Sequence, residues 1–161
     1  MLAIRDGAAT YNMSELPTSD EVILTALDIL AGRLRYGEPL TQPSAAENYL
    51  RLKIGGSERE LFYILFLDNR HRVIAEDTLF MGTIDSSEVH PREVIKATLK
   101  HNAAAVIISH NHPSGMTEPS AADRAITQRL REALDLIGVR MLDHIIVSPH
   151  EATSLANRGW I

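Results

Sequence analysis

The sequence predicts an α/β domain in which a mixed β-sheet is flanked by helices. Short apolar runs of strand length occupy residues 60–67, 103–109 and 139–147. Helices are indicated between these runs, by a start signal at residues 86–93 and by apolar residues at helical spacing over residues 121–137. The chain has 161 residues, of which 45% are hydrophobic, so it can bury one real core.

The N-terminal part is predicted to be a helical segment, residues 1–38, that precedes the main domain at residues 39–161. Residues 1–17 are mixed in composition, and partial disorder is expected there. Thr18 begins a helix whose apolar stripe ends near Gly37. Such stripes usually serve a core, so packing on the main domain is favoured. A role as a dimer or partner-binding helix stays open.

A second helix and a β-meander follow a linker-like break around Pro43. Ser44 is expected to cap a helix that runs to about Leu52, where two glycines stop it. Three strands with short turns are then expected, at residues 60–67, 72–75 and 78–83.

The second half of the chain reads as helix, strand, helix, strand. Pro91 suits the first turn of a helix that ends near His101. A buried strand over 103–109 leads to a loop and to the helix at 121–137, and Gly138 separates that helix from the last strand. The tail at residues 153–157 gives no firm prediction.

The candidate site is a loop between the buried strand and the following helix. His110 and His112 point to the same side if the segment is extended. Ser120 and Asp123 form the S-x-x-[DE] start signal of the helix, which fixes the carboxylate in the first turn. Two imidazoles and a carboxylate are ligands of the type that a catalytic zinc takes, with a fourth position left for water.

A purely structural interpretation accounts for each part of this loop separately. Surface histidines are common, the Ser120–Asp123 pair can be only a helix cap, and Pro113-Ser114-Gly115 turns the chain with or without a metal. The combination of correctly spaced parts favours a metal site over that interpretation.

The loop resembles a known family at every spaced position. His110-x-His112-Pro113, six residues, then Ser120-x-x-Asp123 is similar to the JAMM signature of the JAB/MPN metalloprotease superfamily. Asn111 differs from the serine or threonine usual in eukaryotic deubiquitinating members and fits the bacterial RadC family, whose loop reads HNHPSG. Similarity to RadC segments extends over about residues 40–161. Longer members carry a helix-hairpin-helix-like region, for which no counterpart is seen.

The resemblance implies an MPN (JAB)-like fold and a zinc-dependent metallopeptidase or isopeptidase. It implies one Zn²⁺ per chain on His110, His112 and Asp123, and it aligns Glu60 with the glutamate that serves as general base. Glu58, two residues earlier in the sequence, is the alternative candidate for this general base. Ser120 is expected to donate a hydrogen bond to the developing oxyanion while it caps the helix.

The remaining polar residues are given lesser roles. His90 is expected to shape a helix start, His144 to be a core histidine or to support a ligand from behind, and Asp143 to orient an imidazole. Three further histidines are expected at the surface: His71, His101 and His150.

Two other functions are left open. A metal-dependent hydrolase of another bond, such as a phosphodiester, is one, although Pro113 and Ser114 after the second histidine argue against a two-metal site. A non-enzymatic, DNA-associated module in repair or recombination is the other. The net charge of −5 argues against a broad nucleic-acid surface without excluding a local basic patch.

Composition sets the expected partners and compartment. The chain has no cysteine, which excludes disulfides and thiolate sites and fits the cytoplasm. It shows neither an 18-residue apolar run nor a signal-peptide pattern, so no membrane association is expected. A peptide or protein is the expected substrate, and formation of a homo-oligomer is left open.

Overall fold

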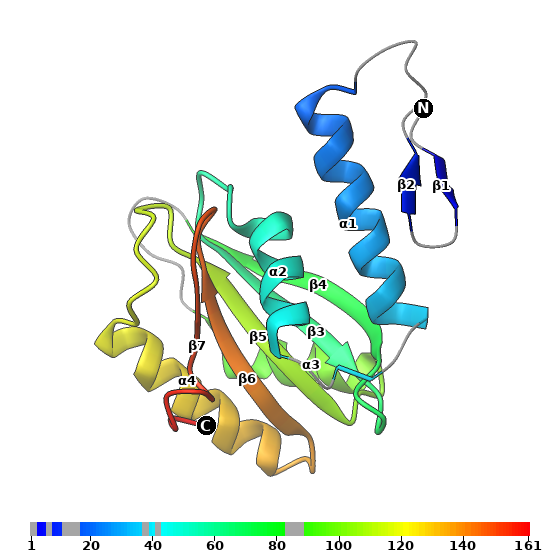
Figure 1. Ribbon diagram of the computed structural model, residues 1–161. Helices are drawn as coiled ribbons and strands as arrows, with labels where there is room; N and C mark the ends of the chain where they lie inside the picture. The colour runs from blue at the N-terminus through cyan, green and yellow to red at the C-terminus, as the bar shows by residue number, and fades with distance from the viewer. Residues whose placement is uncertain (1–2, 6–7, 11–16, 37–38, 41–42, 83–88) are drawn as a thin grey trace.

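A computed structural model of the protein describes residues 3–5, 8–10, 17–36, 39–40, 43–82 and 89–161. Its centre is a β-sheet with helices on both faces (Figure 1). The five strands of this sheet are β3 (Leu61–Leu67), β4 (Val73–Met81), β5 (Ala105–Asn111), β6 (Arg140–Val147) and β7 (Ala152–Ser154). The helices are α1 (Ser19–Tyr36), α2 (Pro43–Ile54), α3 (Pro91–Lys100) and α4 (Ala121–Asp135).

The sheet is mixed, as predicted. Its strand order is β4-β3-β5-β6-β7, and only β5 and β6 run parallel. Helix α4 makes the connection between these two parallel strands, which need a long crossover. The α/β class and the flanking helices are therefore confirmed.

The apolar run of strand β3 has no polar interruption because both faces of the strand are buried. Tyr63, Leu65 and Leu67 point to the core under α1 and α2, while the alternate residues Phe62 and Phe66 point to the core under α3 and α4. Because both faces are covered by helices, neither set of alternate positions is polar.

The same alternation places the first histidine of the site. Val106 and Ile108 of β5 lie in the core on the α3 and α4 side. His110, two residues further along the strand, therefore faces α4, the helix that carries Asp123.

Strand β4 corrects the predicted meander. Residues 73–81 form one strand rather than two, and the polar pair that suggested a break, Glu76 and Asp77, lies opposite Leu65 and Ile64 of β3. As the edge strand, β4 tolerates these polar side chains. Thr83, the predicted end, and the predicted helix start at residues 86–88 lie outside the described residues.

The start of α2 also differs from the prediction. The helix begins at Pro43, so Ser44 lies inside the first turn and is not its cap. It continues to Ile54 and is followed by Gly55, where an added Cβ would come within 2.7 Å of the Ser148 carbonyl oxygen. This close approach, between the end of α2 and the segment after β6, requires glycine.

The N-terminal residues contain two paired strands that the sequence interpretation missed. Strands β1 (Ala3–Arg5) and β2 (Ala8–Thr10) pair antiparallel. These six residues form regular strands, and the Asp-Gly dipeptide between them in the sequence is a signal from which the pairing could have been predicted. Residues 1–2, 6–7 and 11–16 lie outside the described part. None of the described helices combines the length and apolar character needed to cross a membrane.

Candidate metal centre

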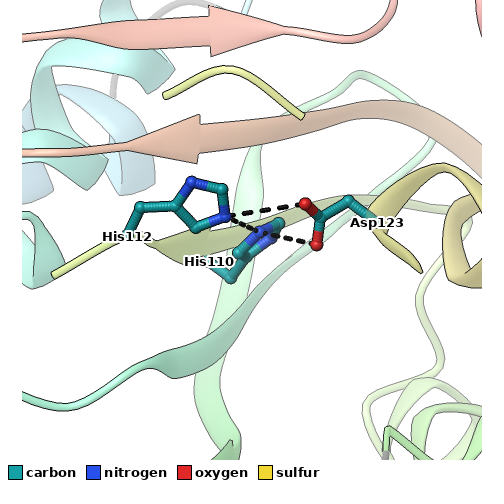
Figure 2. Close-up of side chains that lie close together, drawn as sticks. All are labelled: His110, His112 and Asp123. Carbon is teal, nitrogen blue, oxygen red and sulfur yellow. Dashed lines mark hydrogen bonds and ion pairs between the residues drawn. The ribbon is translucent and has the colours of Figure 1, made fainter. Parts of the chain in front are cut away.

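His110, His112 and Asp123 converge where β5 ends and α4 begins (Figure 2). The Nε2 atoms of the two histidines are 3.0 Å apart. Asp123 Oδ1 lies 3.1 Å from Nε2 of His110, and Oδ2 lies 3.6 Å from Nε2 of His112. The structure therefore brings together the three residues that the sequence offered as metal ligands.

These separations suit a metal ion. With zinc–ligand distances of about 2.0–2.1 Å, tetrahedral ligand atoms stand about 3.3 Å from one another. The three observed separations, two of which end on different oxygens of Asp123, lie on either side of that value. Two imidazole nitrogens with a carboxylate oxygen match the donor set of catalytic zinc sites. The residues present fit a divalent cation, and three protein ligands leave a coordination position for water or substrate.

Ser120 fixes Asp123 through a reciprocal helix cap. The Asp123 backbone N–H donates to Ser120 Oγ at 3.1 Å, and the Ser120 backbone N–H donates to Asp123 Oδ2 at 2.7 Å. The predicted cap is thus confirmed. The Ser120 hydroxyl also donates to Asp123 Oδ2, at 2.6 Å, so the proton that an oxyanion would need is engaged by the carboxylate.

The cluster is electrostatically coupled. Burial would raise the pKa of Asp123, but the interactions with His110 and His112 outweigh burial and hold that pKa well below its usual range. The same carboxylate raises the pKa of His112, against a smaller opposing effect of burial. A carboxylate kept ionised beside two imidazoles is an attractive position for a cation.

His112 is oriented by the loop that follows it. Its Nδ1 donates to the backbone carbonyl of Met116 at 2.8 Å, and the loop turns at Gly115, whose φ of 87° favours glycine. Because a carbonyl oxygen only accepts, the proton of neutral His112 lies on Nδ1. Nε2 then presents its lone pair to the cluster.

His144 supports His110 from behind, as one of the two sequence interpretations held. Its Nε2 lies 2.8 Å from Nδ1 of His110, and its Nδ1 lies 2.6 Å from Oγ1 of Thr127. His144 is fully buried, which holds its pKa well below the usual range. Thr127 was missed, because a threonine within a helix gives no signal of this contact.

Asp143 does not orient an imidazole, so that prediction is wrong. Its carboxylate accepts from the Ser154 hydroxyl at 2.6 Å and from the backbone N–H groups of His144 and Ala156. It points away from the cluster because neighbouring residues of a strand face opposite sides of the sheet. Asp143 fastens the strand to the C-terminal segment.

Asn111 is a second residue whose role was missed. It is fully buried between the two histidines in sequence but faces the other way. Its side-chain amide donates to the backbone carbonyls of Ser57 and Arg59, and its side-chain oxygen accepts from the N–H of Leu61 at 2.7 Å. Strand alternation alone could have predicted that Asn111 points away from the metal side.

Glu60 lies in the backbone stretch that Asn111 holds. Together with His110 and Asp123 it lines a cleft of about 310 Å³, whose wall is largely apolar and includes Phe62 and Ile126. Glu58 does not line this cleft. The carboxylate of Glu60 is exposed and stands near enough to His112 to help raise the pKa of that imidazole.

The other histidines stand apart from the cluster. His90 occupies the N-cap position of α3, as expected, with no side-chain capping bond. His150 is exposed as predicted, whereas His71 and His101 are partly buried. Nε2 of His71 accepts a hydrogen bond from the guanidinium group of Arg140 at 3.0 Å, and the ring of His101 packs against Phe66. The aromatic contact explains why His101 is not a free surface residue.

Comparison with known proteins shows which family and which relatives this chain is similar to. A family profile described as RadC-like JAB domain matches residues 40–160. A UPF0758 protein of Vibrio cholerae strain M66-2 is 57% identical over 132 residues, which cover 82% of this chain and 59% of that protein. A UPF0758 protein of Nitrosococcus oceani is 56% identical over 132 residues, with the same coverage of 82% and 59%.

Another UPF0758 protein of Vibrio cholerae matches over nearly its whole length. It is 49% identical over 151 residues, which cover 94% of this chain and 96% of that protein. The chain therefore spans about 59% of the length of the longer relatives and nearly the full length of this one.

Proposed function

The chain belongs to the RadC family of JAB-domain proteins, and we propose that it is a zinc-dependent metallohydrolase that cleaves an amide bond. In this proposal it is a metallopeptidase or isopeptidase whose substrate is a peptide or protein. The observation that carries the proposal is the convergence of His110, His112 and Asp123 at one edge of an open cleft that Glu60 also lines.

The three clustered residues would hold one zinc ion per chain. Bound zinc would supply Lewis acidity at neutral pH, which polarises a carbonyl and makes water more acidic. The contributions of the chain itself are the ionised carboxylate of Asp123 and the fixed orientation of both imidazoles. Zinc is proposed because two imidazoles and one carboxylate, with a position left for water, form the ligand set of zinc hydrolases.

Glu60 is assigned to proton transfer. It lines the cleft without belonging to the metal cluster, so its carboxylate is free to take a proton from the attacking water and to pass it to the leaving amine. The hydrogen bonds of Asn111 hold the backbone on both sides of Glu60, which limits where the carboxylate can reach.

Ser120 is assigned to the oxyanion. For this role its hydroxyl would turn from Asp123 Oδ2 towards the substrate, while its oxygen still caps α4 by accepting from the Asp123 N–H. The turn costs one hydrogen bond to a carboxylate.

The cleft supports a substrate with an apolar group next to the bond that is cut. Phe62, Val89 and Ile126 form much of its wall beside His110. Apolar walls with few convergent polar groups are typical of sites that bind a side chain and position a reacting bond.

The test is cleavage of a diverse peptide library by zinc-loaded protein, with Glu60→Gln as the matched inactive variant. We expect cleavage by the wild type that a chelator abolishes and that is lost in Glu60→Gln. Cleavage by the wild type in the presence of the chelator, together with cleavage by Glu60→Gln, would refute the assigned chemistry. Absence of peptide cleavage together with zinc-dependent hydrolysis of a phosphodiester substrate would replace the amide by that bond.

A further inference from the structure

We propose that Thr127 and His144 are positioning residues for the metal centre, which act by fixing the tautomer of His110 that leaves Nε2 free to bind a metal. A chain of hydrogen bonds runs from the backbone of α4 through a side chain of β6 to a side chain of β5. These hydrogen bonds determine which ring nitrogen of His110 is protonated. The inference rests on the proposed function in one respect, because it takes Nε2 of His110 as a ligand atom.

The first link is the hydroxyl of Thr127. It lies 2.6 Å from the backbone carbonyl of Asp123, which can only accept, so the single hydroxyl proton points there. The oxygen of Thr127 is also 2.6 Å from Nδ1 of His144. With its proton already used, that oxygen must accept, and His144 therefore carries a proton on Nδ1.

The second link is the imidazole of His144. It is fully buried, and its two ring nitrogens meet only Thr127 and His110 among the described residues, with no carboxylate in direct contact. A charged imidazole without a counter-ion is costly in such surroundings, so the ring is neutral. Since Nδ1 holds the proton, Nε2 is an acceptor.

The third link is the contact between the two rings. Nε2 of His144 lies 2.8 Å from Nδ1 of His110, so Nδ1 of His110 is the donor. His110 therefore carries its proton on Nδ1, and when the ring is neutral its lone pair is on Nε2. That nitrogen is the one within 3.1 Å of Asp123 and 3.0 Å of His112.

The chain of hydrogen bonds begins and ends at Asp123. Its backbone carbonyl accepts from Thr127, and its carboxylate stands beside the His110 nitrogen that these hydrogen bonds set free. One turn of α4 thus supplies a candidate ligand and also determines the tautomer of a second one. Thr127, His144 and His110 are all buried, so water does not offer the ring nitrogens alternative partners.

Thr127→Val is the discriminating variant, and Thr127→Ser is its matched control. Valine keeps the shape of threonine but removes the acceptor, which leaves the Nδ1 proton of His144 without a partner. His144 is then expected to move its proton to Nε2, and His110 to accept on Nδ1 and carry its own proton on Nε2. Serine retains the hydroxyl and should retain the native tautomers.

The first readout uses metal-free, full-length protein labelled with ¹⁵N. Long-range ¹H–¹⁵N correlations of the imidazole rings report which nitrogen is protonated. We expect protons on Nδ1 of both His110 and His144 in the wild type and in Thr127→Ser, and a change to Nε2 in Thr127→Val. An unprotonated Nδ1 on either histidine in the wild type, or unchanged tautomers in Thr127→Val, would overturn the proposal.

The second readout is zinc affinity, measured by competition with a chromophoric chelator. Loss of a residue that supports a metal-binding histidine typically weakens the metal by about 10- to 100-fold, and we expect a loss of this size in Thr127→Val but not in Thr127→Ser. Equal affinities for the two variants would contradict the proposal. If the wild type itself binds no zinc, the proposed function fails, while the tautomer measurement still decides the present inference.

A second pair of variants serves if Thr127→Val does not fold. His144→Gln can still accept from His110 and donate to Thr127, whereas His144→Leu can do neither. We expect His144→Gln to bind zinc within a few-fold of the wild type and His144→Leu to lose about 10- to 100-fold. An affinity in His144→Leu equal to that of His144→Gln would overturn the positioning role.

Discussion

The side-chain oxygen of Asn111 accepts a hydrogen bond from the backbone N–H of Leu61 at 2.7 Å. Asn111 lies between the two histidines of the metal cluster, and Leu61 directly follows Glu60. The contact therefore ties the end of β5, which carries His110 and leads to His112, to the backbone that carries the assigned base. A buried amide with three backbone partners holds this arrangement more firmly than an apolar contact would.

Asn111→Ala is expected to lower both activity and stability. It leaves the N–H of Leu61 and two backbone carbonyls without their partner, and each buried polar group left unpaired costs about 1–3 kcal/mol. We expect kcat to fall more than zinc affinity, because the histidines keep their own partners. Chemical denaturation and zinc titration of the same samples check this. Wild-type kcat in Asn111→Ala would show that Asn111 does not position Glu60.

Glu60→Gln is expected to separate chemistry from metal binding. The amide is similar in shape but cannot accept a proton, so the rate should fall by about 10²–10⁴-fold. Zinc stoichiometry should not change, since Glu60 is not in the cluster. Glu58→Gln is the control, because Glu58 does not line the cleft and should retain activity. Normal activity in Glu60→Gln together with loss of activity in Glu58→Gln would assign proton transfer to Glu58 instead.

Ser120 offers a test that distinguishes its cap from its assigned catalytic role. Ser120→Ala removes both and should lower the free energy of unfolding by about 1 kcal/mol. Ser120→Gly removes the hydroxyl and every side-chain donor, while glycine in place of serine at an N-cap costs only roughly a few tenths of a kcal/mol. It should therefore keep near-native stability while kcat falls by about 10²–10³-fold, as expected for loss of an oxyanion donor. Full activity in Ser120→Gly would leave Ser120 with the cap alone.

Glu76 gives the fold a pH dependence away from the metal centre. Burial raises its pKa, but a 2.5 Å hydrogen bond from Tyr49 and the charge of Lys53 outweigh burial and lower it below the ordinary 4.5. A group with a lowered pKa in the folded state stabilises the fold above its unfolded pKa, and this contribution disappears as the pH falls through the folded value.

Glu76→Gln should therefore destabilise the protein by about 1–2 kcal/mol at pH 7. The gap between this variant and the wild type should close below about pH 4, a window that follows from the carboxyl pKa. Urea denaturation across pH 3–7 measures it, with Asp77→Asn, an exposed neighbour on β4, as control. A gap that stays constant over this range would contradict the assignment.

The ligand-bearing loop could be read from sequence because its signals are local. Strand alternation places His110 and His112 on one side, and the helix start at Ser120 fixes Asp123 one turn later. These relations span few residues and do not depend on the rest of the fold. For the same reason the order of strands and helices around the loop was predictable.

The support around the site could not be read in this way. Thr127 and His144 are 17 residues apart in sequence and meet only because α4 packs on β6. Asn111 meets Ser57 across 54 positions. The single strand β4 was misread because an edge position tolerates polar residues that would interrupt a central strand. Each of these features depends on tertiary packing, which a local sequence pattern does not reveal.

The most direct test of the metal centre is the zinc content of the purified, full-length protein after zinc is offered and the excess removed. It is measured by elemental mass spectrometry beside His112→Ala and beside His150→Ala, which alters an exposed histidine outside the cluster. We predict about one equivalent of zinc in the wild type and in His150→Ala, and almost none in His112→Ala. Equal zinc in all three proteins, or none in the wild type, would contradict a metal centre at His110, His112 and Asp123.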